Sequence, residues 1–178
     1  LDARITNGIV ADQVNATLGD ELITSEGDRT FATSYGNWAN YQSGTVGWDS
    51  NGYLELTTAD GAASGLQLVG ANTTDVVVGD IVKAQIDVKL GTMADDVGGN
   101  SITGIGGAAI SFVATSSWQT VVGYFVADKT NPTLYLKAHV DNSDGGTLLF
   151  DNVSLKQVNG NAGKMVNFDG SDFKMDTH

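Results

Sequence analysis

The segment VVVGDIVKAQIDVKL, residues 76–90, constrains the fold of this chain more than any other stretch. From position 82 onward every second residue is apolar, and the residues between them are polar. Side chains of a β-strand point alternately to opposite faces, so this strand has one dry face and one wet face. The inward side chains are Val82, Ala84, Ile86, Val88 and Leu90, and the outward ones are Lys83, Gln85, Asp87 and Lys89. Such a strand needs a second layer to cover its dry face.

Short strand patterns separated by turn residues fill most of the remaining sequence. The 178 residues include 23 glycines and one proline, and charged residues make up only 17%. Segments such as SGLQLVG, WQTVVGYFVAD and TLLFDNVSLKQV are rich in strand-forming residues, and SNG before position 53 is typical of a hairpin turn. No stretch has a helical period. We predict roughly nine or ten strands in an all-β fold, a two-sheet antiparallel β-sandwich of the jelly-roll type.

Changes in composition and periodicity along the sequence predict three parts: an extended N-terminal arm over 1–18, the jelly roll over 19–158, and an extended C-terminal arm or linker over 159–178. The first part has scattered apolar residues without a clear period, which leaves a short helix, an extended arm and a disordered terminus open. The last part is polar and glycine-rich, with isolated Phe and Met residues. Because the chain starts at Leu1, we expect it to be processed, trimmed or a piece of a longer protein.

The charge of the chain argues against two classes of partner. Nine basic residues against twenty-one acidic ones give a formal net charge of −12. Binding to nucleic acid or to an anionic membrane needs concentrated Lys and Arg, so we predict neither partner. The surplus carboxylates could hold divalent cations.

The sequence carries few traces of an enzyme. There are no cysteines, which excludes thiolate nucleophiles and cysteine-ligated zinc. His139 stands without an obvious partner, and no nucleophile elbow or paired-histidine metal motif occurs. Two carboxylates can hydrolyse a glycoside, but no pair stands out among the twenty-one acids. We therefore predict a non-enzymatic protein.

Aromatic side chains are the best candidates for ligand contact. Flat rings with a polar group suit both sugar faces and extended interfaces. Trp118 shares a predicted strand face with Val122, Tyr124 and Val126, so we assign it to the core. The predicted carbohydrate-contacting residues are Trp38, Tyr41, Trp48 and Tyr135, and we expect Trp38 and Tyr41 to be exposed.

One acidic residue interrupts the apolar middle of the last strand pattern, LLFDNVSLKQV. Strict alternation places Asp151 on the same face as Leu149 and Val153, which looks core-facing. A buried carboxylate needs a cation, an arginine or backbone N–H groups as partners. Asp151 is therefore expected to have a structural role.

The order of these patterns resembles the family 4/9 carbohydrate-binding modules, which have a galactose-binding-like jelly roll. The similar segments are the middle strand VVVGDIVKAQIDVKL, the later WQTVVGYFVAD and the closing LLFDNVSL. The resemblance implies that Asp151 helps to hold a structural calcium ion, with Asp20 and Glu21 as co-ligands, which suits the oxygen chemistry of calcium. The alternative is that Asp151 caps backbone N–H groups in a bend.

The layout also resembles jelly-roll domains of tailed-phage virion proteins, particularly in the run DNVSLKQVNGNAGKMVNF. This resemblance implies a virion structural protein, a capsid decoration or a fibre or adhesin component that docks through its termini. The partners implied are other capsid or fibre subunits, further copies of the chain in a homo-oligomer, and a cell-surface glycan. The alternative is a carbohydrate-binding module of a secreted bacterial polysaccharide-degrading enzyme.

Overall fold

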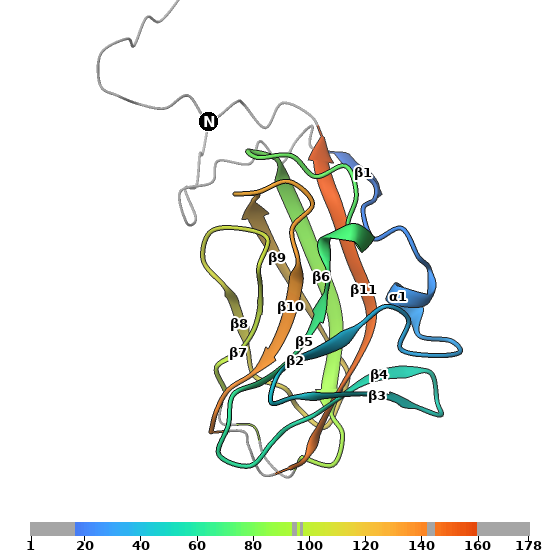
Figure 1. The fold of residues 1–178 in the computed structure, drawn as a ribbon, viewed down its shortest axis with the longest axis vertical. Coiled ribbons are helices and arrows are strands. Elements are labelled where there is room, and N and C mark those ends of the chain that lie inside the picture. Colours follow the sequence, from blue (N-terminus) through green and yellow to red (C-terminus); the bar gives the residue numbers. More distant parts are fainter. Residues whose placement is uncertain (1–16, 94–95, 97, 142–144, 160–178) are drawn as a thin grey trace, which may run out of the picture.

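Two antiparallel sheets pack face to face in the computed structural model, which describes residues 17–93, 96, 98–141 and 145–159 (Figure 1). The predicted jelly-roll β-sandwich is confirmed. The six-stranded sheet contains β3 (Thr45–Asp49), β4 (Tyr53–Thr57), β11 (Thr147–Asn159), β6 (Ile81–Leu90) and β9 (Gln119–Val126) in that order, with β1 (Thr17–Glu21) also paired to β11. The five-stranded sheet has the order β2 (Ala39–Gln42), β5 (Ser64–Leu68), β10 (Leu134–Ala138), β7 (Asn100–Thr103) and β8 (Ile110–Phe112).

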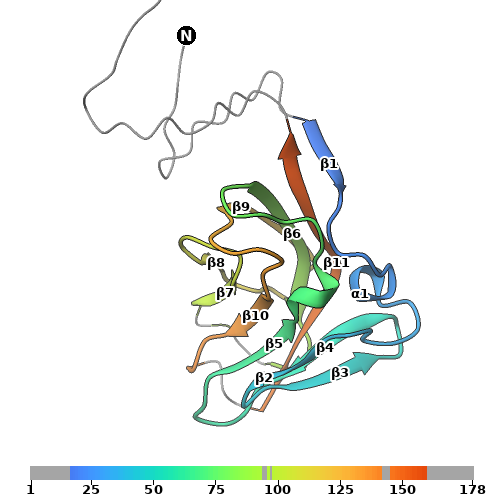
Figure 2. The same cartoon turned by 45° about the horizontal axis from the view of Figure 1, so that its top comes forward.

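Two short helices, α1 (Gly27–Thr30) and the 3₁₀ turn η1 (Gly70–Asn72), accompany the eleven strands of the described residues. Figure 2 shows β1 alongside the end of β11, and α1 near the middle of that strand. None of the helices described is long and apolar enough to cross a membrane. Most of both predicted arms lies outside the described residues, although Thr17 and Leu18 belong to β1 and pair with Asn159 and Val158.

The core lies between the sheets and follows the alternation of β6. Val82, Ala84, Ile86 and Val88 are buried as predicted, and they face apolar side chains of the opposite sheet. Those partners come from β5, β7 and β10 and comprise Leu66, Leu68, Ile102, Leu134 and Leu136. Each fully buried side chain of this size contributes about 1.5–3 kcal/mol, so the core is the main source of stability.

The side chains of β9 face the core and the solvent in the opposite way to the prediction. Trp118, Val122 and Tyr124 are 36%, 43% and 51% exposed, whereas Phe125 is buried. Phe125 pairs with Val82 of β6, and Tyr124 pairs with Lys83, so the register with β6 fixes which face is inward. The assignment of Trp118 to the core is therefore wrong. Both faces of this strand are apolar, so its own sequence did not distinguish them.

A β-bulge in β11 places the side chain of Asp151 on the outer face of the sheet and not in the core. The pairing with β6 shifts between Asp151 and Ser154, where Asn152 adopts a left-handed conformation with φ 48°. As a result, Phe150 is inward before the bulge and Val153 is inward after it, so the predicted single alternation is wrong. Asp151 lies half-buried on the outer face, where its Oδ1 accepts a hydrogen bond of 2.7 Å from the Asn152 N–H. This is the contact that the backbone-capping alternative requires.

The environment of Asp151 disfavours its charge. Partial burial is the largest influence and raises the pKa of the Asp151 carboxyl; the Asn152 hydrogen bond lowers it, and the charge of Asp87 on the facing strand raises it further. A carboxyl with a raised pKa binds more protons in the folded state than in the unfolded state. The contribution of the Asp151 carboxyl to the free energy of unfolding therefore falls as the pH rises through that pKa.

We predict that Asp151→Asn raises the melting temperature at pH 7 and that the gain disappears near pH 3, below the ordinary carboxyl pKa of about 3.9. Thermal unfolding at both pH values, with the exposed Asp60→Asn as control, measures the difference. A loss of stability at pH 7 would instead show that the Asp151 charge has a favourable partner, such as a bound cation.

A fully buried aspartate fastens α1 to the segment that follows it. Asp28 accepts hydrogen bonds from the Asn37 backbone N–H at 2.5 Å and from Asn37 Nδ2 at 2.9 Å. Its backbone carbonyl accepts the indole N–H of Trp38 at 2.9 Å. These three bonds satisfy polar groups that burial would otherwise make costly.

Asp28→Ala is expected to lower the free energy of unfolding by roughly 2–3 kcal/mol, because it removes the buried acceptor of two hydrogen bonds from Asn37, each worth about 1–1.5 kcal/mol. Urea denaturation measures the change. Asp60→Ala, which removes an exposed carboxylate, should change stability by less than about 0.5 kcal/mol. Equal effects of the two substitutions would contradict this role of Asp28.

Candidate ligand-binding site

Two tyrosines meet on the outer face of the five-stranded sheet. Tyr41 on β2 and Lys137 on β10 both pair with Gly65, which lies between them on β5, so Tyr41, Gly65 and Lys137 form one row. Tyr135, two residues before Lys137 and on the same face of β10, places its ring centroid 4.5 Å from that of Tyr41. Gly65 makes room for this approach, since a Cβ there would lie 3.2 Å from Tyr41 Cδ1 and 2.9 Å from the Leu136 carbonyl oxygen.

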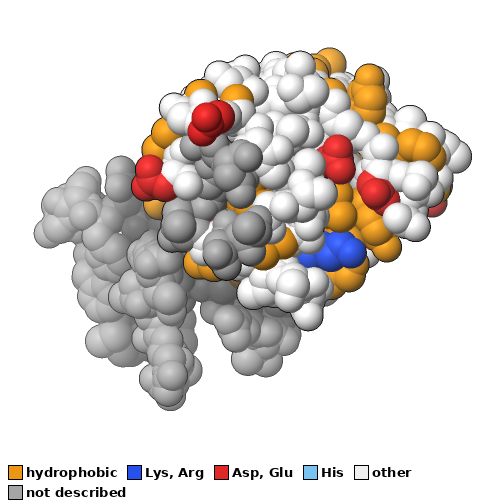
Figure 3. Space-filling model, turned by 90° about the horizontal axis from the view of Figure 1, so that it is seen from below, with side chains coloured by type: hydrophobic (Ala, Val, Ile, Leu, Met, Phe, Trp, Pro, Cys, Tyr) orange, Lys and Arg blue, Asp and Glu red, His pale blue; other side chains and the backbone are white. Residues whose placement is uncertain are grey.

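A lysine completes the pair of rings. Lys137 Nζ lies 5.1 Å from the Tyr41 ring centroid and 5.6 Å from that of Tyr135, within the range of cation–π attraction. Both rings are half-buried, so each keeps part of its surface open to solvent. In the view from below, basic side-chain atoms likewise border hydrophobic ones (Figure 3).

Uncharged polar side chains extend the face on either side of the rings. Gln67 and Thr103 flank Tyr135 in one row of paired residues, and Ser101 follows Lys137 in the next. These residues offer hydroxyl and amide groups beside aromatic planes, and none of the residues in the two rows is acidic. Such a surface can bind a polyhydroxylated ligand by stacking and hydrogen bonding, but it offers no acid–base pair for hydrolysis.

The two predicted tryptophans lie away from this pair of rings. Trp38 is only 2% exposed, so the prediction that it is exposed is wrong. Its ring packs in the hydrophobic core, and the hydrogen bond to the Asp28 carbonyl satisfies its one polar group. Trp48 is 39% exposed but belongs to β3 of the other sheet, and its indole N–H donates to the Phe31 carbonyl at 2.7 Å. Both indoles therefore hold the α1 region in place through their polar groups.

The three predicted calcium ligands do not come together. Both carboxylate oxygens of Glu21 are occupied: the Leu155 N–H and the Ser154 hydroxyl donate to them at 2.7 Å. Asp20 is exposed, and Asp151 lies at the bulge beside Asp87. Within the described part of the chain, no three acidic or histidine side chains form a group that could hold a metal. This trio does not fit calcium, and calcium binding stays a prediction.

His139 lies on the same strand face as Lys137 and just beyond β10. Its Nδ1 lies 3.4 Å from the Asp141 carboxylate, and its side chain is well exposed. This placement agrees with the expectation of a surface histidine.

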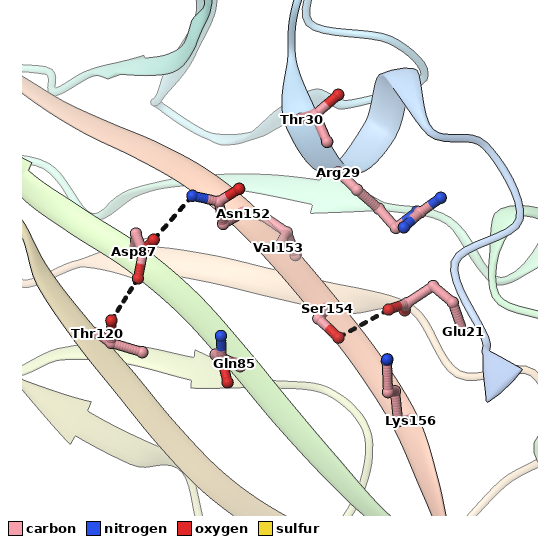
Figure 4. A pocket seen from close by; sticks show the side chains of 10 residues that line it. All are labelled: Glu21, Arg29, Thr30, Gln85, Asp87, Thr120, Asn152, Val153, Ser154 and Lys156. Carbon is pink, nitrogen blue, oxygen red and sulfur yellow. Dashed lines mark hydrogen bonds between the residues drawn. The ribbon is translucent and has the colours of Figure 1, made fainter. Parts of the chain in front are cut away.

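The sequence did not reveal an open hollow of about 380 Å³ on the outer face of the six-stranded sheet (Figure 4). Residues from β1, α1, β6, β9 and β11 line it, among them Arg29, Asp87, Asn152 and Lys156. In Figure 4, Arg29 reaches in from α1 and Lys156 from β11. No local motif marks this feature, because it depends on the bulge and on five separate segments.

Comparison with solved structures identifies the fold as that of carbohydrate-binding modules. A CBM4 module is 21% identical and aligns over 72% of this chain and 99% of its own, with a TM-score of 0.55. The CBM22-1 xylan-binding domain of Xyn10C from Paenibacillus barcinonensis is 14% identical over 74% of this chain and 93% of its own, with a TM-score of 0.53.

A similar domain also occurs in a phage protein. The enzymatically active domain of tailspike protein 4 from bacteriophage CBA120 is 14% identical over 76% of this chain, which corresponds to 21% of the tailspike chain, with a TM-score of 0.52. At these identities the likeness establishes the fold. No family model and no curated protein sequence matches this chain.

Proposed function

We propose that this protein is a non-enzymatic, glycan-binding adhesion module whose ligand lies on the outer face of the five-stranded sheet. The observation that carries the proposal is the Tyr41–Tyr135 pair, held across Gly65 with Lys137 over both rings. The fold shared with carbohydrate-binding modules supports it.

The physical case rests on the two kinds of surface that a sugar presents. The C–H faces of a pyranose ring are apolar and pack against an aromatic plane, whereas the hydroxyls at its rim need hydrogen-bonding partners. Tyr41 and Tyr135 supply the planes, and Gln67, Ser101 and Thr103 supply uncharged donors and acceptors on the same face. A neutral polysaccharide is the class that these groups match best.

Replacing either tyrosine is expected to weaken polysaccharide binding. Tyr41→Ala or Tyr135→Ala should each lower affinity roughly threefold to tenfold, the equivalent of about 0.5–1.5 kcal/mol for an aromatic contact. Affinity electrophoresis in gels containing β-glucan or xylan measures the retardation of each variant.

Tyr124→Ala is the matched control, because Tyr124 is an exposed tyrosine on β9 of the other sheet. It should migrate like the unsubstituted protein. Absence of retardation for the unsubstituted protein in every gel, or equal loss in all three variants, would contradict the proposed site.

We also propose that this module works in a phage virion, as a capsid decoration or as a fibre or adhesin component that assembles with virion subunits and with copies of itself. Two observations favour this setting: the resemblance of the run DNVSLKQVNGNAGKMVNF to virion proteins, and the similar fold within a tailspike. The second candidate, a module of a secreted polysaccharide-degrading enzyme, is favoured by the fold it shares with the xylan-binding domain of Xyn10C.

Oligomeric state separates the two settings. The virion proposal predicts that the full chain forms a symmetric oligomer and that removal of residues 1–16 and 160–178 reduces it to a monomer. Size-exclusion chromatography with light scattering on both forms gives the masses. A full chain that is strictly monomeric, and unchanged by the removal, would favour the secreted module.

A further inference from the structure

The outer face of the six-stranded sheet carries a second pair of rings with a lysine over it. The ring centroids of Tyr53 and Trp118 lie 4.9 Å apart, and Lys89 Nζ lies 5.2 Å and 4.8 Å from them. These distances are close to those of the Tyr41–Tyr135 cluster on the opposite sheet. The two clusters lie on opposite outer faces of the sandwich, because each is built from outward residues of its own sheet.

Basic residues gather on this same face. Four of the six Lys and Arg residues in the described chain lie on it or reach over it: Arg29, Lys83, Lys89 and Lys156, with Lys129 and Lys137 elsewhere. Within the described residues, none of the four forms an ion pair with a carboxylate. The acidic side chains of this face are Glu21, Asp49, Glu55, Asp87 and Asp151, so four cations lie among five carboxylates, whereas the whole chain has a net charge of −12.

The hollow joins these cations to the aromatic cluster. Gln85 and Asp87 line the hollow, and Lys89 of the aromatic cluster is the next outward residue of β6. From Gln85 to Lys89 the strand runs roughly 13 Å, at about 3.3 Å per residue. Rings therefore lie at one end of a continuous strip and cationic groups at the other.

The polar groups of the hollow are unequally satisfied. Asp87 accepts hydrogen bonds from Thr120 at 2.5 Å and from Asn152 at 2.8 Å, and Glu21 accepts from Ser154. By contrast, Arg29 Nε is buried without a hydrogen-bond partner, the one such side-chain atom among the described residues. The carboxylates are thus occupied by donors of the protein, whereas no hydrogen bond or ion pair among the described residues engages the guanidinium of Arg29.

We propose that this strip is a second ligand site, separate from the one on the five-stranded sheet, which binds an oligosaccharide carrying carboxylate groups. Trp118 stacks on one sugar ring, with Tyr53 set at 61° to it as a side wall, and Arg29 and Lys156 hold a carboxylate at the hollow. A guanidinium is the side chain best suited to a planar carboxylate. Four of the six described cations lie on this face, which reduces the repulsion that a chain with a net charge of −12 exerts on such a ligand.

Trigalacturonate is the probe, and its fully methyl-esterified form is the matched neutral control. Isothermal titration calorimetry on the full chain should detect trigalacturonate binding that weakens with added salt, and weaker binding of the ester. The double variant Arg29→Gln, Lys156→Gln should lose about tenfold or more in affinity. Trp118→Ala should lose roughly threefold to tenfold.

Lys129→Gln controls for the loss of a cation outside the strip, and it should bind as the unsubstituted protein does. Circular dichroism checks that each variant is folded, and Lys156→Gln alone replaces the double variant if that one does not fold. The proposal is overturned if the unsubstituted chain does not bind trigalacturonate, if the ester binds equally well, or if the strip variants bind unchanged.

Tyr135→Ala separates this site from the proposed function. It should leave trigalacturonate affinity unchanged and weaken only the binding of neutral polysaccharide. Loss of both kinds of binding in Tyr135→Ala would mean that a single site, on the five-stranded sheet, takes both ligands.

Discussion

The structure depends on one strand, β6, whose dry face is pressed against the opposite sheet. β6 pairs with β11 on one side and β9 on the other, so its register sets the inward face of both neighbours. Burial of Val82, Ile86 and Val88 makes any slip by one residue costly, because it would exchange the dry face for the wet one. With the core fixed in this way, the outward positions of both sheets become free to carry polar and aromatic side chains.

The fold was predictable where local pattern and tertiary contacts agree. The alternation of β6 and the turn before Tyr53 both predict what the structure has, with Gly52 in the left-handed conformation at φ 89°. Prediction failed where only a neighbouring strand decides. β9 is apolar on both faces, so its pairing with β6 places Trp118 outside, and the bulge at Asn152 reverses the alternation of β11.

The candidate site was only partly visible in the sequence. Tyr41 and Tyr135 were named as separate aromatic residues, and only the strand order β2–β5–β10 with Gly65 between them brings their rings together. Trp38 has an equally suitable side chain, but its ring packs in the core, where its N–H is satisfied by the Asp28 carbonyl. The hollow beside Arg29 assembles from five segments and leaves no local signal. The outer face of the five-stranded sheet thus carries uncharged polar groups around a single lysine, whereas that of the six-stranded sheet carries four cations among carboxylates.

The central claim is that a neutral glycan lies on the outer face of the five-stranded sheet. Titration of the ¹⁵N-labelled protein with a neutral β-glucan oligosaccharide, followed by amide chemical shifts, tests it most directly. The account predicts that the shifted amides are confined to β2, β5, β10 and β7, around Tyr41 and Tyr135. Shifts confined to the six-stranded sheet or to loops, or no shifts at saturating oligosaccharide, would contradict it.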